Sequence, residues 1–585
     1  MGVFAVDSPG FDGEITIHLR GGMGMTTSAV TRTASTRTAR SRRTARAISL
    51  ADRPWSDPEV AWERFCGFLD LDRESYSRIQ TELLNEQVRL VSQGRLGARL
   101  LRYSLPTSIE EFRQTVPLTD YGDYAEALDR ENTQNLPEGD YTWAHTTGAR
   151  ANFKWVPYTR RAYNRLLDGV MAAFILSAAR EKGDVRIGPG TTVMYNTPPR
   201  PYLSGLVTFG MRERFGLRGV IEPEMAEKME FKSKIRKTFE KALKEQVDYI
   251  VSMTSVLVRA GETFEQDSDS RSQSSSSSSN SIRSLNARAL WRIVKAKSKS
   301  AILHRPVRPK DLWPAKGIIG WGVDTAVFRD RVEEFWGKPP FEMYACTEGG
   351  IMGVQSYEHK GLVFIPYSGF YEFIPESENN RARNETGYTP ETVLLEETVP
   401  GETYEVVITN FYGQPFLRYR LGHFVKFLEP PPGGFAHGPE FEFLGRADDR
   451  IDIAGFTRVD EATLWQALRD SGLNLKDWTM TPEHVGDRPI LSLYAEMDDT
   501  HNADDVASQI HNALKARDPF YKDLESMLGI QPLRASKLTT GTFERFYDEK
   551  RAQGRELHEL QPPRMNPGDS VVADLMRLSL GGPKQ

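Results

Sequence analysis

The chain has 585 residues, which at roughly 150 residues per domain predicts two or three domains and excludes a single small binding module. Its 39% hydrophobic residues are enough to bury large cores. Lys and Arg number 75 against 80 Asp and Glu, and the resulting net charge of −5 argues against nucleic acid as the main partner.

Two further features bear on the compartment. The two cysteines, Cys66 and Cys346, are too few for a disulfide framework, which suits a reducing compartment. The longest apolar run, 170–179, has about ten residues, whereas a bilayer-spanning helix needs roughly twenty. We therefore expect a cytoplasmic protein with no membrane span.

The amino end is basic. Residues 15–51 contain seven arginines and no acidic side chain, which resembles an organellar transit peptide. The alternative is a disordered basic tail, or sequence upstream of a true start at Met23 or Met25, and we favour it because the apolar residues form only a weak amphipathic stripe. Residues 1–55 are thus expected to be a disordered basic tail or a targeting segment.

Helices and strands alternate after this point. Apolar residues at helical spacing predict a surface helix over 74–91. Short β-rich runs recur between helical stretches, which predicts an α/β architecture. The runs are 191–195, 248–251, 317–321 and 404–409.

Two polar stretches and one turn divide the chain. Residues 265–285 include the serine run 274–279 and are expected to be a disordered Ser-rich insertion, and 376–390 resembles a shorter one. Three prolines at 430–432 indicate a stiff turn near a domain boundary. We expect a large domain over 56–440 and a smaller one over 441–585.

Four segments carry residues suited to nucleotide chemistry. They are a Thr-Thr-Gly loop with a following lysine (143–157), Tyr-Ala-Cys-Thr-Glu-Gly-Gly (344–350), Arg-Tyr-Arg-Leu-Gly-His (418–423), and a polar turn between short strands (443–455). The first suits a phosphate loop, and the second gathers an aromatic ring, a hydroxyl and a Mg²⁺-binding carboxylate. Each taken alone is equally an ordinary turn, a core tyrosine, a solvated glutamate or a strand edge.

The order and spacing of these segments resemble the adenylate-forming superfamily, which converts a carboxylate and ATP into an acyl-AMP. The resemblance is closest to the auxin-responsive acyl-acid amido synthetase family, through 370–375, 418–420, 541–543 and 562–564, and it covers about residues 57–566. It implies a large multi-sheet α/β amino-terminal domain with a smaller α/β carboxy-terminal cap domain. It also implies ATP and Mg²⁺ as cofactors, with a small carboxylic acid and an amine such as an amino acid as substrates.

The resemblance implies a role for each residue that matches a family motif, with Asp448 and Asp449 at a hinge. The expected catalytic residues are Lys154, Glu348 and Arg446, with Glu348 also binding the metal. The expected nucleotide-binding residues are Thr146, Thr147, Gly148, Tyr344, Thr347, Arg420 and His423.

Three positions depart from the family pattern. His145 replaces a glycine ahead of the threonine pair, where a side chain would crowd the phosphates or strain the backbone, and strain of that kind costs roughly 1 to 3 kcal/mol. His423 replaces a ribose-binding aspartate, and losing a charged hydrogen bond costs roughly 1.5 to 3 kcal/mol. Gln561 stands where the family has a lysine, and Lys550 could take the role of that missing lysine. The two histidines would form a new metal or phosphate site if paired, although separate histidines are the commoner outcome.

Two functions from different classes follow. The first is an ATP-dependent acyl-acid amido synthetase. Apolar and aromatic residues of the segment 195–209 are candidates for its acyl pocket, although core packing is the commoner use of most such residues. The second is a degenerate relative that binds a carboxylate or a nucleotide without turnover. A coenzyme A ligase is a weaker third alternative.

Overall fold

The structure, a computed structural model, describes residues 57–580 apart from a set of short gaps. The gaps are 148–152, 230, 271–285, 322–324, 386, 431–437, 447–449, 454–456, 474, 486–487, 498–500, 519–520, 523–530 and 553–563. The predicted tail 1–55, the loop glycine Gly148, the hinge aspartates Asp448 and Asp449, and Gln561 all lie outside the described residues.

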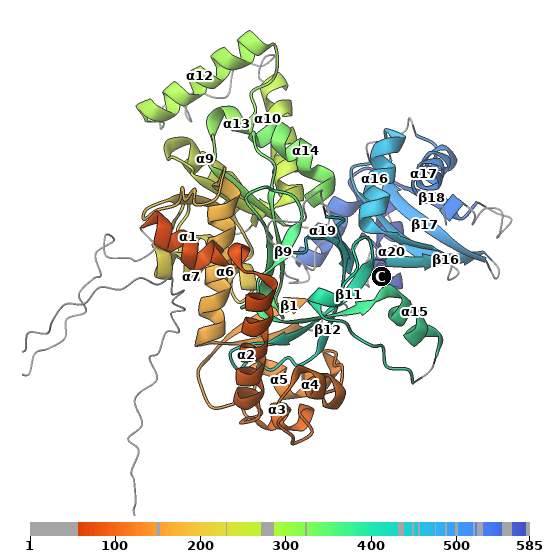
Figure 1. Ribbon diagram of the computed structural model, residues 1–585. Helices are drawn as coiled ribbons and strands as arrows, with labels where there is room; N and C mark the ends of the chain where they lie inside the picture. Colours follow the sequence, from red (N-terminus) through yellow and green to blue (C-terminus); the bar gives the residue numbers. More distant parts are fainter. Residues whose placement is uncertain are drawn as a thin grey trace, which may run out of the picture. The chain divides into compact units, whose positions relative to one another are not determined.

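An eleven-stranded mixed sheet is the largest element, in the order β10-β11-β12-β13-β9-β8-β7-β6-β5-β3-β4 (Figure 1). The half from β7 to β4 is parallel and the other half is antiparallel. The parallel half consists of β3 (Thr192–Asn196), β4 (Arg218–Gly219), β5 (Tyr249–Met253), β6 (Gly317–Trp321) and β7 (Phe341–Cys346). The antiparallel half consists of β8 (Gly350–Gln355), β9 (Leu362–Phe364), β10 (Gly369–Pro375), β11 (Thr403–Asn410), β12 (Tyr419–Phe427) and β13 (Phe441–Arg446).

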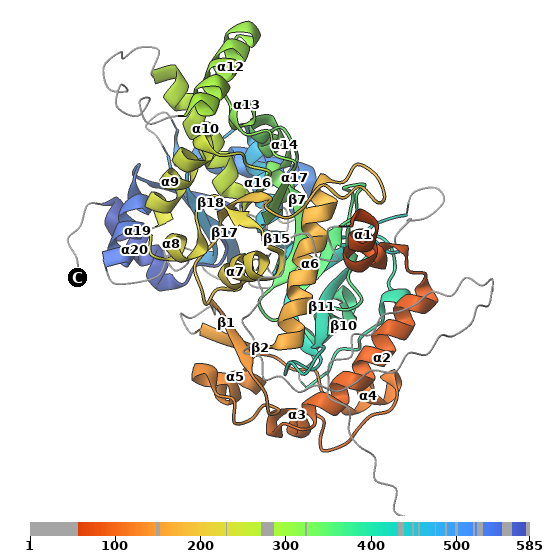
Figure 2. The same cartoon turned by 90° about the vertical axis from the view of Figure 1, so that its left-hand side faces the viewer.

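One long helix, α6 (Arg160–Ala178), covers a face of this sheet against β6, β7 and β8 (Figure 2). It contains the apolar run seen in the sequence, and that run is buried in the main hydrophobic core. Five helices precede it in the chain: α1 (Pro58–Cys66), α2 (Arg73–Val91), α3 (Arg95–Leu100), α4 (Ile109–Thr115) and α5 (Gly122–Leu128). The helix α7 (Leu203–Phe215) packs against α6 and against strand β1 (Tyr141–Thr147).

A second core lies on the other face of the parallel strands. Trp313, Trp336 and Phe335 are buried there beside Met194 and Ile250 of the sheet. The surrounding helices are α8 (Pro223–Glu227), α9 (Phe231–Lys244), α10 (Thr254–Ser270), α12 (Ala287–Leu303), α13 (Pro309–Leu312) and α14 (Thr325–Trp336).

The carboxy-terminal part has its own three-stranded sheet, β16-β17-β18, and its own core around the buried Trp478. Its elements are α16 (Glu461–Ser471), β16 (Trp478–Val485), β17 (Arg488–Glu496), α17 (Ala503–Arg517), β18 (Leu533–Leu538), α19 (Thr542–Ala552) and α20 (Asp569–Ser579). A hairpin of β14 (Arg450–Ile453) and β15 (Thr457–Asp460) lies between the two sheets in the sequence. The carboxy-terminal part therefore forms a second, smaller α/β unit with a core of its own.

The predicted fold class is confirmed, because the chain forms a large mixed sheet with helices and a smaller α/β unit. The helix predicted over 74–91 is α2, and the four predicted strands coincide with β3, β5, β6 and β11 to within two residues at either end. Both cysteines are free, Cys66 being buried. None of the described helices is both long enough and apolar enough to cross a bilayer.

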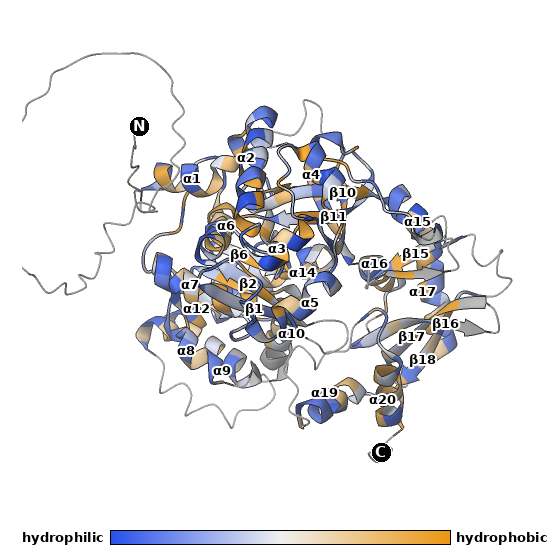
Figure 3. Cartoon of the chain, turned by 90° about the horizontal axis from the view of Figure 1, so that it is seen from below, coloured by the Kyte–Doolittle hydropathy of each residue, from blue (hydrophilic) through white to orange (hydrophobic). Residues whose placement is uncertain are grey.

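Three boundaries differ from the sequence-based expectation. Helix α10 continues through Ser270, so the first residues of the expected insertion 265–285 are helical and the rest lies outside the described residues. Helix α15 (Glu376–Asn384) occupies most of 376–390, and its residues are hydrophilic (Figure 3). Strand β13 pairs with β12 and β9 in the large sheet, so that sheet extends through Arg446 rather than ending at 440.

Candidate functional site

A hairpin positions the predicted phosphate loop. Strands β1 and β2 (Phe153–Thr159) pair antiparallel with Thr146 opposite Lys154, and the residues between the strands lie outside the described part of the chain. The Lys154 ammonium lies 5.3 Å from the centre of the Tyr121 ring. The Tyr121 hydroxyl accepts a hydrogen bond of 2.6 Å from the Trp155 backbone N–H, so the ring that carries the cation is itself fixed to the hairpin.

The turn between β7 and β8 holds Glu348 against this lysine. Lys154 Nζ and Glu348 Oε1 are 3.6 Å apart, and Glu348 is buried. The Tyr158 hydroxyl donates to the Thr347 carbonyl at 2.6 Å, and the Asn410 amide donates to the Glu348 carbonyl at 2.9 Å. The turn is therefore held by hydrogen bonds from β2 and β11. Its carboxylate lies beside Lys154, which with Arg150 is one of two cations in the phosphate-loop segment.

His423 lies in β12 directly opposite Arg446 of β13. Its Nδ1 is 3.2 Å from the Tyr344 hydroxyl. Burial, together with the positive charges of Arg446 and Lys154, lowers the pKa of His423 to about 3. The imidazole is therefore neutral at physiological pH, and the two cations that influence it are the ones predicted to act on the nucleotide.

Tyr344, predicted to stack on adenine, is covered by other rings. Phe364 and Phe441 contact it edge-on at 6.0 and 5.6 Å, and Phe443 lies tilted at 5.5 Å. The residue is only 3% exposed, and burial raises the pKa of its hydroxyl well above the usual value. In this conformation the ring has no open face for a base.

Arg420 was predicted to bind the nucleotide, and the structure places it in an ion pair. Its Nη2 lies 2.6 Å from Glu405 Oε2 and donates to Asn379 Oδ1 at 2.9 Å. These partners belong to β11 and α15, so the guanidinium joins a strand to a helix. Glu405 lies 15 residues before Arg420 on the preceding strand, and the antiparallel pairing of β11 with β12 brings the two side chains together.

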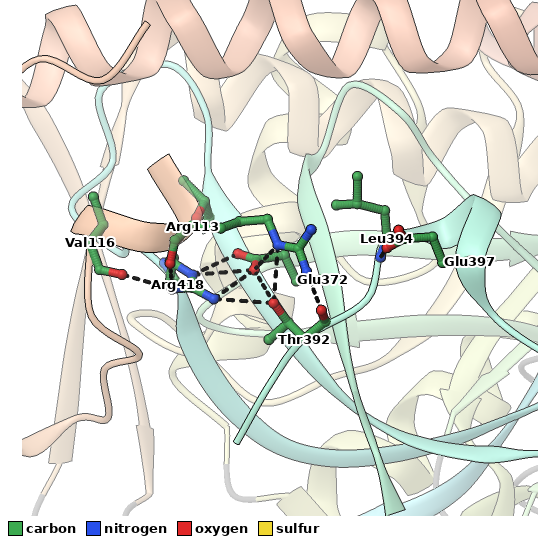
Figure 4. Close-up of polar contacts among 8 residues, drawn as sticks. Arg113, Val116, Glu372, Thr392, Leu394, Glu397 and Arg418 are labelled. Atoms are coloured by element: carbon green, nitrogen blue, oxygen red, sulfur yellow. Dashed lines mark hydrogen bonds and ion pairs between the residues drawn. The ribbon is translucent and has the colours of Figure 1, made fainter. Parts of the chain in front are cut away.

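The first arginine of the same motif, Arg418, is a buried structural residue (Figure 4). Its guanidinium donates to both carboxylate oxygens of Glu372, at 2.9 to 3.2 Å, and to the Val116 carbonyl at 2.7 Å. Thr392 Oγ1 donates to Glu372 at 2.7 Å. Glu372 belongs to the 370–375 segment, so two of the segments that carried the resemblance meet in one ion pair.

His145 does not have the strained backbone expected at a glycine position. It lies in β1 opposite Trp155, and it is not among the described residues with a positive φ. Its ring is 4% exposed and packs edge-on against Tyr202 at 4.4 Å and Trp155 at 5.3 Å. The pairing with His423 is not observed, since His423 contacts Tyr344 and Phe443 instead. Among the described residues, no group of three or more His, Cys, Asp or Glu is arranged to hold a metal ion.

Lys550, considered as a substitute for the missing lysine, lies in α19. Its ammonium forms an ion pair of 2.8 Å with Asp574 of α20. The cation is therefore used to join two helices of the carboxy-terminal part, and the substitution is not supported by this conformation.

The segment expected to line the acyl pocket borders a pocket in the structure. A pocket is bounded by Pro198, Pro199, Thr208 and Phe209, and by residues of the neighbouring helices. Lys234 of α9 is at its wall and donates to the Thr197 carbonyl, and burial lowers its pKa to about 8. This lysine could not be singled out from the sequence, because it lies in a helix with several other lysines.

Two buried polar side chains near this pocket have no hydrogen-bond partner among the described residues. They are the amide of Asn196 and the hydroxyl of Ser252, which lie opposite each other at the carboxyl ends of β3 and β5. Ligands of open α/β sheets bind at the carboxyl ends of parallel strands. Asn196 was not predicted, although its place between a strand and the Thr-Pro-Pro turn is a usable signal.

Comparison with protein families gives a match over residues 362–446, to the GH3 family central domain. This range includes β9 to β13, and therefore Glu372, Arg418, His423 and Arg446.

Known proteins with similar sequences are plant acid-amino acid ligases. The chain is 30% identical over 292 residues to a jasmonoyl-L-amino acid synthetase, GH3.5 of Oryza sativa subsp. japonica, a match covering 45% of this chain and 48% of that protein. It is 27% identical over 226 residues to a 4-substituted benzoates-glutamate ligase, GH3.12 of Arabidopsis thaliana, covering 35% of this chain and 37% of that one. The sequence matches thus span about half the length of these curated relatives or less.

Solved structures match over nearly the whole chain. The acyl acid amido synthetase AtGH3.15, in complex with 2,4-DB, superposes with a TM-score of 0.63 at 18% identity, covering 89% of this chain and 96% of that one. A 2-hydroxyisobutyryl-CoA ligase superposes with a TM-score of 0.53 at 13% identity, covering 92% of this chain and 98% of that one. The adenylate-forming fold expected from the sequence is therefore confirmed.

Proposed function

Because the chain carries a GH3 family central domain and has homologues among the GH3 acyl acid amido synthetases, we propose that it is an ATP-dependent acyl-acid amido synthetase. The reaction has two steps. A carboxylate oxygen of the acid attacks the α-phosphorus of ATP and pyrophosphate leaves, and an amine then attacks the acyl-AMP carbonyl and AMP leaves. The observation that carries the proposal is the meeting of Lys154 and Glu348 at 3.6 Å, since these residues come from two of the four motif segments.

The site has the charges that this chemistry requires. Lys154 and Arg446 both act electrostatically on His423, so both cations lie around the same point. Phosphoryl chemistry depends mostly on positioning and on stabilising negative charge, and a pair of fixed cations serves both purposes. We assign the phosphates of ATP to Lys154, with the loop residues Thr146, Thr147 and Gly148, and assign Arg446 to the nucleotide at the end of β13.

The residues present also fit a magnesium ion. Mg²⁺ is commonly held by one or two carboxylates together with substrate phosphates and water, and Glu348 supplies such a carboxylate. When bound there, the ion would neutralise charge on the phosphates. The separation of 3.6 Å between Lys154 Nζ and Glu348 Oε1 is longer than a direct hydrogen bond, so the carboxylate would be available to hold the ion.

His423 and Tyr344 are assigned to the nucleoside as a unit. When the Tyr344 hydroxyl donates to Nδ1, the neutral imidazole carries its proton on Nε2 and can donate it to a ribose oxygen. A carboxylate in this place would accept two hydrogen bonds, so the histidine binds the ribose more weakly. Adenine stacking on Tyr344 requires the Phe443 side of the ring to open, because that neighbour lies tilted toward the ring face.

The acid and the domain roles follow from the same fold. We assign the acid to the pocket of Pro198, Pro199 and Thr208, whose mostly apolar lining suits the apolar part of an acid. The residues after Arg446 are proposed to act as the cap domain. The free cysteines suit a cytoplasmic protein, and a targeting function of residues 1–55 is the alternative.

Product analysis tests the proposal. The protein is incubated with ATP, Mg²⁺, a panel of carboxylic acids and the twenty amino acids, and products are identified by mass spectrometry. An acid-amino acid amide formed with stoichiometric AMP supports the proposal. A thioester formed only when coenzyme A replaces the amino acids identifies a coenzyme A ligase instead.

The second candidate, a degenerate relative without turnover, is favoured by one observation, the closed ring cluster around Tyr344. Calorimetric ATP binding with no AMP formed for any acid would support it. Formation of AMP therefore distinguishes the synthetase from the degenerate relative, whereas ATP binding is expected of both.

A further inference from the structure

Helix α12 exposes a row of large apolar side chains. Trp291, Val294 and Ile302 are 64%, 62% and 75% exposed, and Leu290 is 39% exposed. Large apolar side chains scattered singly on a surface are ordinary, but these four lie on one 17-residue helix that projects from the body of the structure (Figure 1). This concentration requires an explanation.

The four side chains form one stripe. At 100° per residue, Leu290, Val294, Trp291 and Ile302 fall within about 120° of one another. The two fully buried residues of the helix, Ala289 and Ala296, lie on the opposite side. The helix therefore rests on the protein through Ala289, Ala296 and the partly buried Ile293, and the four residues of the stripe face the exterior.

Basic residues border the stripe on both sides. Arg288 and Lys295 follow one edge and Lys297 the other, and α12 contains no acidic residue. The Lys295 ammonium lies 5.1 Å from the Trp291 ring centre, so aromatic and cationic groups alternate on the exposed face. Neither Arg288 nor Lys297 has an ion-pair partner among the described residues, whereas Lys299 pairs with Asp311 at 2.9 Å.

The positive charge continues on both sides of the helix. From Asn286 through Lys310 the described chain has eight Arg or Lys and no Asp or Glu. Helix α9 lies beside α12, to which it is joined by hydrogen bonds from Asn286 to the Lys244 carbonyl, at 3.0 Å, and from Arg292 to the Glu245 carbonyl, at 2.5 Å. It adds the exposed Lys237 and Lys244 to the same region. A chain with a net charge of −5 thus concentrates cations around one apolar stripe.

We propose that the exposed face of α12 binds an anionic phospholipid surface, with Trp291, Val294 and Ile302 inserted at the level of the headgroups and the flanking cations against the lipid phosphates. An amphipathic helix with a tryptophan and aliphatic residues on one side and Lys and Arg on the other lies in the plane of a membrane interface. Each cation near an anionic surface adds about 1 kcal/mol. The chain would bind peripherally, since no described helix is able to span a bilayer.

The charge and the apolar character of this face favour an anionic phospholipid surface over a second copy of the chain or a nucleic acid. A second copy of the chain would bring like charges together on the two basic helices. Nucleic acid would use the cations and the tryptophan, but Val294 and Ile302 have no apolar partner on a phosphate backbone. Only a surface with both negative charge and an apolar layer satisfies the stripe and its borders.

Vesicle co-sedimentation of the full chain tests the proposal. Vesicles of phosphatidylcholine alone are compared with vesicles containing 30% phosphatidylserine at about 0.1 M salt. The chain is expected to bind the anionic vesicles and to be released by high salt, since screening shortens the reach of the charges. Trp291→Ser with Val294→Ser and Ile302→Ser should lower binding at least about tenfold, and Arg288→Glu with Lys297→Glu should do so by about tenfold or more.

Matched variants separate the face of α12 from a general surface effect. The apolar control is Leu105→Ser with Val399→Ser, two residues that are 55% and 53% exposed elsewhere. The charge control is Arg78→Glu with Arg218→Glu, both exposed. Unchanged binding of these controls supports the proposal.

Three results would overturn it. The first is no binding of the unaltered chain to anionic vesicles. The second is binding that the α12 variants leave unchanged. The third is concentration-dependent self-association in sedimentation velocity, or binding of single-stranded DNA, that depends on Trp291 while vesicle binding is absent. All variants alter exposed side chains, and an unchanged melting temperature verifies that they fold.

Discussion

Lys154 Nζ lies 3.6 Å from Glu348 Oε1, which joins the β1–β2 hairpin to the β7–β8 turn by a cation and a buried carboxylate. The pair is flanked by Tyr121, whose ring lies 5.3 Å from the ammonium. A lysine at this place can bind a phosphate while the carboxylate binds a metal ion. An ordinary surface ion pair has neither role.

Replacing either partner should remove activity with little change in folding. Lys154→Ala and Glu348→Gln are each expected to lower the rate of AMP formation by about 100- to 1,000-fold, because charge stabilisation of the transition state is lost. The lysine control is Lys426→Ala, an exposed lysine of β12, which should keep full activity. A Lys154→Ala protein with unaltered turnover would show that the loop assignment is wrong.

His423 should make stability depend on acid pH. Its pKa is about 3 in the folded chain against an ordinary value of 6.5, so between these values the unfolded chain takes up a proton that the folded chain does not. Stability from this site is complete above about pH 6.5 and falls as the pH decreases, by up to about 1.4 kcal/mol per pH unit. The advantage of the native chain over His423→Gln in melting temperature should therefore shrink between about pH 7 and pH 5.

The matched control for this experiment is His304→Gln, an exposed histidine at the end of α12. Its difference from the native chain should stay nearly constant over the same range. A constant difference for His423→Gln as well would contradict the buried neutral imidazole.

The Glu372–Arg418 pair should contribute strongly to stability. Arg418→Met leaves the buried Glu372 carboxylate with only the longer ion pair of 3.6 Å to Arg113, and breaking a buried ion pair on one side costs about 3 to 5 kcal/mol. The exposed pair of Arg381 and Glu385 provides the comparison, and Arg381→Ala should change stability by less than about 1 kcal/mol. Thermal unfolding of both variants measures the difference, and equal effects would mean that the buried pair is weak.

His145 should stabilise the hairpin rather than obstruct ATP. Its ring packs between Tyr202 and Trp155, so His145→Gly removes that packing and should lower stability by about 2 kcal/mol or more. ATP affinity, measured by calorimetry, should not improve. Tighter binding of ATP by the glycine variant would revive steric crowding as the role of this histidine.

The sequence predicted the elements that follow from local pattern. The amphipathic spacing in α2 and the β-rich runs of β5, β6 and β11 depend on the residues of each segment, and these were found within two residues. The proximity of Lys154 and Glu348 could be expected from the sequence, because the family that the motif order resembles has both residues in one site.

The remaining contacts depend on strand pairing that no local pattern encodes. Arg420 reaches Glu405 because β12 pairs with β11, and His423 lies opposite Arg446 because β12 also pairs with β13. A one-residue change of register would turn either side chain to the other face. For the same reason the sequence could not show that Tyr344 is enclosed by Phe364 of β9 and by Phe441 and Phe443 of β13.

Acid-dependent exchange of labelled pyrophosphate into ATP tests the central claim most directly, because it reports the adenylation step alone and needs no amine. With a panel of carboxylic acids, the native chain and Lys426→Ala should both catalyse exchange for at least one acid, and Lys154→Ala and Glu348→Gln should catalyse almost none. ATP bound at the site without exchange for any acid in the native chain would contradict adenylation by this protein.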